Sequence, residues 1–181
     1  MAEPPTAERV TAPKELIDKL EIRELLERYM RYNDDRCVEP LVELFDDDLV
    51  FQAAGVSTGK EELRALFSIG ESDPPHWTEP GQLLKQPASV HISSNPVIDV
   101  DGDTATAESD FLVMKRAEDG KARPALVGRY RDRLRRRSDG RWVITVRVAV
   151  SVARPGEERS DAEWQRMLAS LSAEERAKYR T

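Results

Sequence analysis

The pattern of hydrophobic and polar positions divides the chain into a helical first half and a strand-rich second half. Within residues 14–32, apolar side chains recur every three or four positions, which predicts an amphipathic helix. The side chains on this stripe are Ile22, Leu25, Leu26, Tyr29 and Asn33. Residues 38–45 and 59–67 predict two shorter helices, residues 46–48 a loop, and residues 49–51 a short strand.

The strongest strand signal is the stretch 90–114, in which Asp101-Gly102 separates two runs of alternating polarity. An Asp-Gly pair in that setting predicts a tight hairpin turn, because such turns need positive φ angles. Asp-Gly pairs at 119–120 and 139–140 predict further turns and hence strands over 126–137 and 142–150. The last strand is nearly all apolar, which predicts a central place in the sheet. Segregated helices and antiparallel strands indicate an α+β fold, with helices across the concave face of a curved sheet and a conical cavity between them.

Three segments are predicted to lie outside this core. Residues 1–13 are rich in Pro, Ala and Glu and predict a flexible tail. Residues 70–87 contain four prolines and predict a long loop, of the kind that forms lids and binding loops or is disordered, with Trp77 as a candidate substrate contact. Residues 153–181 predict a linker and a helical extension whose apolar stripe packs on its own domain or on a partner chain. The folded domain is therefore expected over 14–152.

Composition and charge argue against several classes of function. The chain is 39% hydrophobic and 34% charged, and its net charge of −6 argues against a general nucleic-acid binder. Cys37 stands alone, so a disulfide framework is not expected, and a reducing, cytoplasmic location fits best. Two histidines and one cysteine, far apart in sequence, argue against a zinc site. We expect neither a membrane span, which needs roughly 20 apolar residues, nor a secretory signal, because the N-terminus has no basic start and no apolar run.

Five motifs resemble, in order, the nuclear-transport-factor-2-like (NTF2-like) superfamily and, within it, the SnoaL-like group. The pieces that carry the resemblance are Ile22-Arg23-Glu24-Leu25-Leu26-Glu27-Arg28-Tyr29 followed by Asp34, Leu44-Phe45-Asp46-Asp47-Asp48, Gly59-Lys60-Glu61-Glu62-Leu63, the hairpin from His91 to Ala105, and the last two strands around Gly128-Arg129-Tyr130-Arg131-Asp132 and Gly140-Arg141-Trp142 to Arg147. Together they cover about residues 14–152.

This resemblance implies a cone-shaped α+β barrel that commonly forms homodimers through the outer face of its sheet. It also implies a wide range of chemistries, because the family contains isomerases, dehydratases, dehydrohalogenases, polyketide cyclases, epoxide hydrolases and non-catalytic members. Several family enzymes use a buried aspartate at the end of the first helix as a base or as the partner of a catalytic histidine, and Asp34 matches that position. Arg147 matches a pocket arginine of some members.

One departure from the family pattern concerns the histidine. In the dehydrohalogenase-like members, the catalytic histidine lies about one helical turn before the hairpin histidine, and Pro87 stands there in this chain. The resemblance therefore implies that their Asp–His pair is not carried over intact. His91 occupies the hairpin position instead.

Asp34, His91 and Arg147 each have a chemical and a structural interpretation. In an apolar cavity, the Asp34 carboxylate would be desolvated and would act as a base, although the run at 33–35 also fits a solvated helix end. His91 would serve as an acid or hydrogen-bond donor, or as a structural histidine within the sheet. Arg147 is the only charge in an apolar strand. If it points inward it needs a partner such as Asp34, Asp132 or a ligand carboxylate, whereas an outward Arg147 would lie at a dimer interface.

We therefore expect a cofactor-independent small-molecule enzyme of isomerase, dehydratase or cyclase type, acting on an apolar or polycyclic carbonyl substrate. Asp34 would be base or orienter, His91 acid or donor, and Arg147 the stabiliser of developing negative charge. Side chains expected to contact the substrate are Tyr29, Tyr32, Asn95, Tyr130 and Trp77. The alternatives are a non-catalytic ligand-binding or protein-interaction module and the small subunit of a ring-hydroxylating oxygenase. The enzyme hypothesis requires Asp34, His91 and Arg147 to converge within hydrogen-bond reach of one open space.

Overall fold

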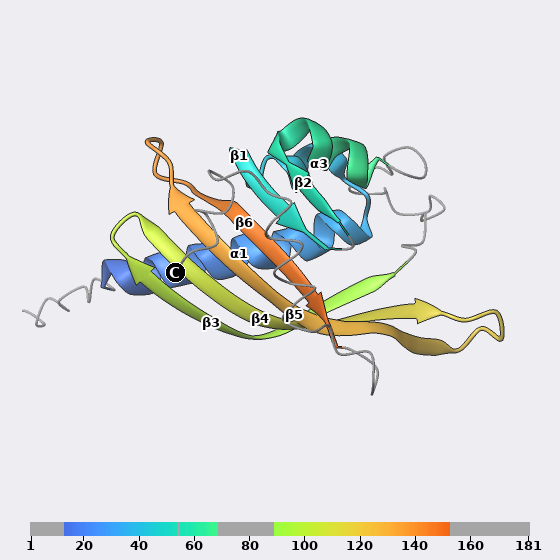
Figure 1. The fold of residues 1–181 in the computed structure, drawn as a ribbon. Coiled ribbons are helices and arrows are strands. Elements are labelled where there is room, and N and C mark those ends of the chain that lie inside the picture. The colour runs from blue at the N-terminus through green and yellow to red at the C-terminus, as the bar shows by residue number, and fades with distance from the viewer. Residues whose placement is uncertain (1–12, 54, 69–88, 153–181) are drawn as a thin grey trace, which may run out of the picture.

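The computed structural model describes residues 13–53, 55–68 and 89–152 of the chain. Helices and strands alternate irregularly in the first half and give way to long strands in the second (Figure 1). The elements are α1 (Lys14–Asp34), α2 (Val38–Val42), β1 (Phe45–Gln52), β2 (Val56–Thr58), α3 (Gly59–Phe67), β3 (Val90–Asp101), β4 (Thr104–Arg116), β5 (Ala122–Arg136) and β6 (Trp142–Ser151).

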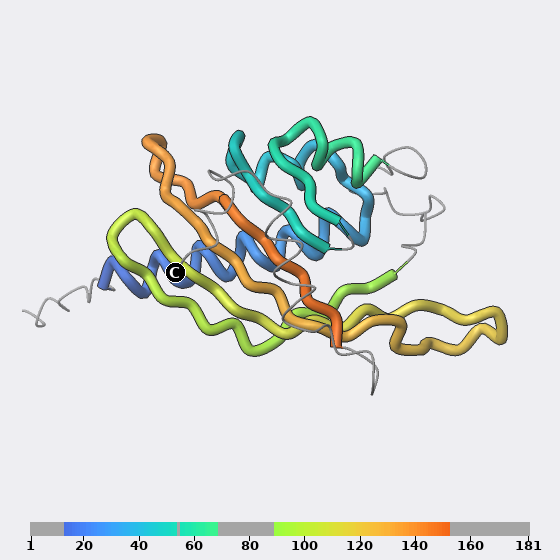
Figure 2. The backbone as a smooth tube through the Cα atoms, in the orientation of Figure 1, coloured from blue at the N-terminus to red at the C-terminus, as the bar shows by residue number. Residues whose placement is uncertain are grey.

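The six strands form one curved sheet in the order β2-β1-β6-β5-β4-β3. Neighbouring strands are antiparallel except β1 and β6, which are parallel. The sheet is unclosed, because β2 and β3 lie at opposite edges. Helix α1 runs across one face of the sheet, and α3 lies beside β1 and β2 (Figure 2). The expected cone-shaped α+β fold is confirmed, and β6 has the central place that its apolar sequence predicts.

The predicted hairpin is the β3–β4 pair. Asp101 and Thr104 are opposed at the end of the ladder, and Gly102 adopts a φ of +59° at the turn between them. The ladder is irregular between Ser94 and Val97, where Asn95 adopts a φ of +52°. The second and third Asp-Gly turns are also present, because Gly120 and Gly140 both have positive φ angles. Turn chemistry that can be read from the sequence therefore fixes the order of four of the six strands, β3 to β6.

The interior of the cone is filled by aromatic side chains. The Tyr29 ring lies edge-on to Phe45, Phe67 and Tyr130, with ring centroids 5.9 to 6.2 Å apart. Phe111 stacks against Tyr130 with a centroid separation of 4.3 Å. Such contacts add to the free energy gained by burying the rings themselves. Tyr29 and Tyr130, predicted as substrate contacts, are therefore core residues.

The inward face of β5 follows the predicted alternation. Gly128, Tyr130, Asp132 and Leu134 are buried, whereas the arginines between them point to the other face. Gly128 lies directly beside the Phe111 ring and the Val150 carbonyl, and an added Cβ would overlap both. This glycine therefore allows the Phe111–Tyr130 stack to form.

The prediction of a loop over residues 46–48 is wrong. These residues belong to β1, and the predicted helix over 38–45 ends at Val42. The Asp46 side chain is buried and forms ion pairs with Arg135 and Arg137. Burial by itself would raise the pKa of Asp46, but its hydrogen bonds, the largest from Arg135, outweigh that effect and lower the pKa. The buried carboxylate of this acidic run is thus compensated by arginines about 90 residues away in sequence.

The predicted tail (1–13, except Pro13), proline-rich loop (70–87) and C-terminal extension (153–181) lie outside the described residues. In the part of the chain that the structure describes, no helix has both the length and the apolar character needed to cross a membrane.

Candidate functional site

The candidate site lies where α1 ends. Asp34 is the last residue of α1, and the chain then turns sharply through Arg36, which adopts a φ of +56°. A left-handed backbone costs a residue with a side chain about 1 to 2 kcal/mol. The turn is closed by a hydrogen bond from the Cys37 amide to the Tyr32 carbonyl at 2.8 Å. The Asp34 residue is only 8% exposed, and its carboxylate faces strand β3 and not solvent.

Asp34 and His91 form a close pair. The Asp34 Oδ1 atom lies 2.6 Å from His91 Nδ1, and Oδ2 accepts a hydrogen bond from the His91 backbone amide at 2.7 Å. Ser89 Oγ donates to Oδ1 at 3.4 Å. Two of these contacts come from one residue, so the carboxylate fixes both the ring and the backbone of His91. An Asp–His pair is therefore present, although the resemblance implied that the family's pair is not carried over intact. The Pro87 position lies outside the described residues.

The contacts of the His91 ring define its tautomer. An ionised Asp34 carboxylate can only accept a hydrogen bond. In a neutral ring, the proton therefore lies on Nδ1, the nitrogen that contacts Asp34. The other nitrogen, Nε2, is then an acceptor and lies 3.4 Å from Asn33 Nδ2, which can donate to it. The helical spacing predicts Asn33 on the same side of α1 as Tyr29, and in the structure its amide contacts the His91 ring. The result is a histidine whose lone pair faces the end of α1.

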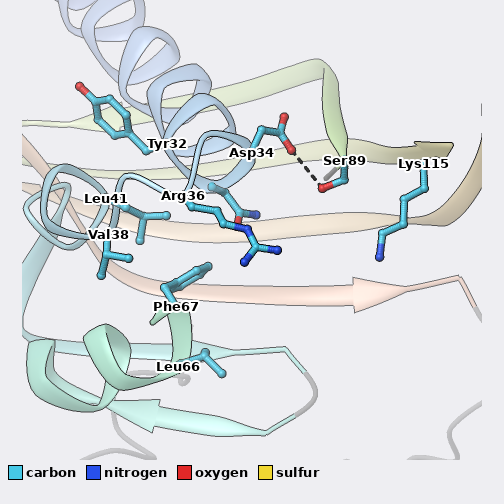
Figure 3. Close-up of a pocket in the computed structure, with 10 residues that line it drawn as sticks. Tyr32, Asp34, Arg36, Val38, Leu41, Leu66, Phe67, Ser89 and Lys115 are labelled. Atoms are coloured by element: carbon cyan, nitrogen blue, oxygen red, sulfur yellow. Dashed lines mark hydrogen bonds between the residues drawn. The ribbon is translucent and has the colours of Figure 1, made fainter. Parts of the chain in front are cut away.

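A pocket of about 220 Å³ opens beside this pair. Its wall combines polar side chains from the end of α1, the start of β3 and the end of β4 with apolar side chains from α2 and α3 (Figure 3). The lining residues are Tyr32, Asn33, Asp34, Arg36, Val38, Leu41, Leu66, Phe67, Ser89 and Lys115. Of the predicted site residues, Asp34 and Tyr32 line the pocket. His91 does not line it, but it contacts the lining residues Asn33 and Asp34.

Arg147 does not reach this pocket. Its side chain is completely buried and pairs with Asp132 through two contacts, Nε to Oδ1 at 2.7 Å and Nη2 to Oδ2 at 2.9 Å. Its guanidinium carbon lies 4.0 Å from the centre of the Tyr29 ring and 4.6 Å from that of Tyr130. Arg147 is therefore inward and paired with Asp132, which was one of the expected arrangements, but it is enclosed by the core. The predicted convergence of Asp34, His91 and Arg147 on one open space is not found.

The electrostatic surroundings of Arg147 and of the two tyrosines beside it, Tyr29 and Tyr130, agree with a structural role for these side chains. Burial alone would lower the pKa of Arg147, but the charge and hydrogen bonds of Asp132 outweigh it, so the pKa lies above its ordinary value. Burial raises the pKa of Tyr29 to about 12 and also raises that of Tyr130. Arg147 therefore stays charged and Tyr29 and Tyr130 stay protonated near pH 7, so none of these three is poised to transfer a proton there.

Two other predicted contacts lie away from the pocket. Asn95 is exposed at the irregular position of β3 and does not line the pocket. Trp77 lies outside the described residues. No group of three or more His, Cys, Asp or Glu side chains that could hold a metal ion occurs within residues 13–53, 55–68 and 89–152.

Sequence reasoning missed several side chains that line the pocket. Arg36 and Lys115 belong to charged runs that resemble solvated surface, and Ser89 precedes the strand in which His91 was recognised. Leu66 and Phe67 lie at the end of α3, and their contribution depends on how that helix packs. Of these residues, only Lys115 could have been found from the sequence. It lies an even number of positions from the inward residues Phe111 and Val113, and strand alternation therefore places it on the same face.

The family model that describes the SnoaL-like domain matches residues 14–148. The chain belongs to the SnoaL-like domain family. No curated protein is detectably similar to it in sequence.

Solved structures of similar fold cover most of the chain. An NTF2-like protein with a cystatin-like fold from Novosphingobium aromaticivorans is 26% identical to this chain and superposes with a TM-score of 0.64. The aligned region covers 84% of this chain and 90% of that protein. A proposed scytalone dehydratase of that organism is 22% identical, with coverages of 77% and 87% and a TM-score of 0.58. The beta subunit of its proposed aromatic-ring-hydroxylating dioxygenase is 20% identical, with coverages of 78% and 94% and a TM-score of 0.62. The last two likenesses show the fold alone.

Proposed function

We propose that this SnoaL-like protein is a cofactor-independent enzyme that moves a proton on a small apolar carbonyl compound, as an isomerase, dehydratase or cyclase does. The observation that carries the proposal is the 2.6 Å contact between Asp34 and His91 at the wall of a pocket. Asp34 holds the proton of the ring on Nδ1, which leaves Nε2 as the basic atom. A substrate that displaces the Asn33 amide would place its acidic C–H bond against Nε2.

The roles of the two residues follow from this geometry. Nε2 of His91 accepts the proton, the electron pair of the C–H bond moves into the carbonyl to give an enolate, and Asp34 stabilises the imidazolium that forms. The same imidazolium then returns the proton to another atom of the substrate or to a leaving group. This scheme is narrower than the hypothesis drawn from the sequence, which required Arg147 at the same open space. The core encloses Arg147, so the proposal rests on the Asp34–His91 pair alone.

The test uses deuterium exchange, since it needs no knowledge of the product. A panel of small aromatic and alicyclic ketones is incubated with the full chain in D₂O, and exchange of the α-hydrogens is followed by mass spectrometry. A compound that exchanges with the wild type should exchange about 10² to 10⁴ times more slowly with Asp34→Asn or His91→Gln. Asn95→Ala, on the same strand as His91 but outside the pocket, should leave the rate unchanged. Equal rates in wild type and Asp34→Asn would overturn the mechanism.

A non-catalytic ligand-binding or protein-interaction module is the second candidate, and one observation favours it. The enzyme hypothesis needed Arg147 in the pocket, and Arg147 is buried elsewhere. A wild-type protein that binds compounds of the panel without exchanging any hydrogen would support this candidate. A small subunit of a ring-hydroxylating oxygenase is a third candidate, for which the likeness to a dioxygenase beta subunit shows only the fold. Co-purification of a large iron-containing protein is its test.

We also propose a cytoplasmic homodimer that forms through the outer face of the sheet. Several apolar side chains on the strands and at the end of β6 are 43% to 66% exposed, and they include Ile92, Val97, Val127, Val150 and Val152. Exposed apolar residues that gather on one face are typical of an interface. Analytical ultracentrifugation of the wild type and of Val127→Glu tests this. The wild type should sediment as a dimer and the variant as a monomer.

A further inference from the structure

The proposed proton transfer creates a negative charge that the Asp34–His91 pair does not stabilise. When Nε2 of His91 takes the proton, the electron pair of the C–H bond moves to the carbonyl oxygen of the substrate and gives an enolate. A hydrogen-bond donor aimed at such an oxygen supplies a large part of the rate enhancement of many enzymes. The sequence suggested Arg147 for this role, but the core encloses that side chain. The reaction therefore needs a different donor.

Four polar side chains of the pocket wall are engaged elsewhere or solvated. Tyr32 and Arg36 both interact with other groups. The Ser89 hydroxyl donates to Asp34. Lys115 is exposed at the end of β4, where water and salt screen the charge of its ammonium group. None of these four side chains is therefore a good candidate for the donor.

The remaining donor side chain of the wall, the Asn33 amide, lies at the basic nitrogen itself. Asn33 lines the pocket, and its Nδ2 atom is 3.4 Å from Nε2 of His91. That distance exceeds the range of about 2.7 to 3.2 Å that is usual for N–H···O hydrogen bonds, so the contact is weak. An amide nitrogen has two hydrogens to donate. A substrate can therefore draw this amide away from Nε2 at little cost and accept a hydrogen bond from it.

The separation of the amide and the base suits a carbonyl compound. In a ketone, the oxygen lies about 2.4 Å from the α-carbon, as the lengths of the C=O and C–C bonds require. A ketone whose oxygen accepts from Asn33 Nδ2 therefore presents its α-C–H bond to His91 Nε2, because the two nitrogens are only 3.4 Å apart. Donor and base thus contact the two substrate atoms whose charge changes in enolisation.

The end of α1 positions both groups. Asn33 and Asp34 are the last two residues of this helix. The Asn33 carbonyl accepts a hydrogen bond from the Arg36 amide at 3.3 Å, which ties Asn33 to the turn that follows. Asp34 in turn holds the His91 ring at 2.6 Å. One helix end therefore sets the donor directly and the base through Asp34.

We propose that Asn33 is the third catalytic residue of the site: its amide donates to Nε2 of His91 in the free protein and to the carbonyl oxygen of the substrate in the complex. The inference rests on the proposed function for the reaction, and it assigns the group that recognises the carbonyl and stabilises the enolate. Removal of the amide has two opposite consequences. Nε2 becomes more accessible, yet proton transfer slows because the enolate loses its donor.

Asn33→Ala separates a catalytic amide from one that only covers the base. Alanine favours the helix, so the variant should fold. Exchange of α-hydrogens in D₂O, measured with the ketone panel, should be about 10² to 10³ times slower than in the wild type. Diethyl pyrocarbonate should modify the His91 ring faster than in the wild type, with His76 as the internal reference in peptide mass mapping. Asn95→Ala, at an exposed position outside the pocket, should match the wild type in both measurements.

Either of two results in Asn33→Ala would overturn the proposal. Exchange at the wild-type rate or faster would show that the amide covers the base and does not stabilise the enolate. Unchanged modification of His91 would show that the amide does not cover Nε2 in the free protein.

Carbon-13 NMR of acetophenone labelled at its carbonyl carbon tests recognition without turnover. A hydrogen bond to the carbonyl oxygen moves this resonance downfield. Acetophenone bound to the full wild-type chain should therefore resonate downfield of acetophenone bound to Asn33→Ala, and Asn95→Ala should give the wild-type position. Equal positions in wild type and Asn33→Ala, or failure of acetophenone to bind the wild type, would overturn the proposal.

Asp34→Asn distinguishes a failure of this inference from a failure of the proposed function. This variant should lose proton exchange and keep the downfield position of bound acetophenone, because its Asn33 amide is intact. Exchange that is lost in Asp34→Asn but unaffected in Asn33→Ala overturns this inference alone. A wild type that exchanges no hydrogen but shows the Asn33-dependent resonance overturns the proton transfer and supports carbonyl recognition by Asn33.

Discussion

The Arg147 guanidinium and the Asp132 carboxylate form a two-pronged pair across neighbouring strands, with contacts of 2.7 and 2.9 Å and no exposed surface on either side chain. The Arg147 guanidinium packs against the rings of both Tyr29 and Tyr130. Ionic groups buried this deeply are tolerated because each one compensates the other. The pair therefore organises the core of the cone, and the chemistry of the pocket lies elsewhere.

Removal of one member of the Arg147–Asp132 pair should lower the free energy of unfolding more than removal of both members. Asp132→Asn should lower the free energy of unfolding by about 3 to 5 kcal/mol, because it leaves the Arg147 charge buried without compensation. The double variant Asp132→Leu/Arg147→Met should recover most of that loss. Urea unfolding measures both. Asp110→Asn, which breaks the exposed pair with Arg129, should cost less than about 1 kcal/mol, and a similar cost for Asp132→Asn would contradict the assignment.

The Asp34–His91 contact should be visible without a substrate. A proton shared over 2.6 Å between a carboxylate and an imidazole is strongly deshielded, so a proton NMR resonance downfield of the amide region is expected for the Nδ1–H group. The chain has two histidines, so His91→Gln and His76→Gln suffice to assign it. The resonance should vanish in His91→Gln and in Asp34→Asn and persist in His76→Gln. A resonance that survives in Asp34→Asn would show that another group holds the ring.

Gly128 should tolerate no side chain. In Gly128→Ala the new Cβ would overlap the Val150 carbonyl and lie 2.6 Å from Phe111 Cζ. Because the carbonyl belongs to the sheet backbone, the strands would have to separate, at a cost of about 1 to 3 kcal/mol or more. Thermal unfolding measures the effect. Gly55→Ala is the control, since no atom lies within 4 Å of its added Cβ, and equal melting temperatures of the two variants would show that the core absorbs the overlap.

Stability should fall in alkali because of the buried phenols. The pKa of Tyr29 is raised to about 12 by burial, whereas an unfolded tyrosine ionises near pH 10. Between these values the unfolded chain has lost a proton that the native chain keeps. This contribution to stability is therefore complete below about pH 10 and is lost as the pH rises through 12. Urea unfolding at pH 9 to 11 should show a smaller loss of stability for Tyr29→Phe than for wild type.

The control variant for the alkaline unfolding experiment is Tyr32→Phe. The Tyr32 side chain lines the pocket and is only partly buried. Its variant should keep the pH dependence of the wild type. If Tyr29→Phe follows the wild-type curve as well, the alkaline loss arises from other groups.

Local chemistry in the sequence determined the main features of the fold. The helical spacing of Ile22, Leu25, Leu26 and Tyr29 predicts α1, and the Asp-Gly pairs predict the hairpin turns. These signals suffice because neighbours in sequence supply both partners of each interaction. The acidic run 46–48 shows the limit, since β1 pairs with the distant strand β6 and the buried Asp46 pairs with Arg135 and Arg137, about 90 residues away in sequence.

The candidate site depends mainly on tertiary structure. The sequence predicted Asp34 and His91, through the resemblance and the hairpin pattern, but gave no information on which groups they contact. Period-two alternation left the face of Arg147 undecided, and pairing with Asp132 and packing against Tyr29 place it in the core. Likewise, only the packing of α1, α3 and β4 brings Lys115 to the pocket. A side chain's role depends on long-range contacts, which a residue's neighbours in sequence do not specify.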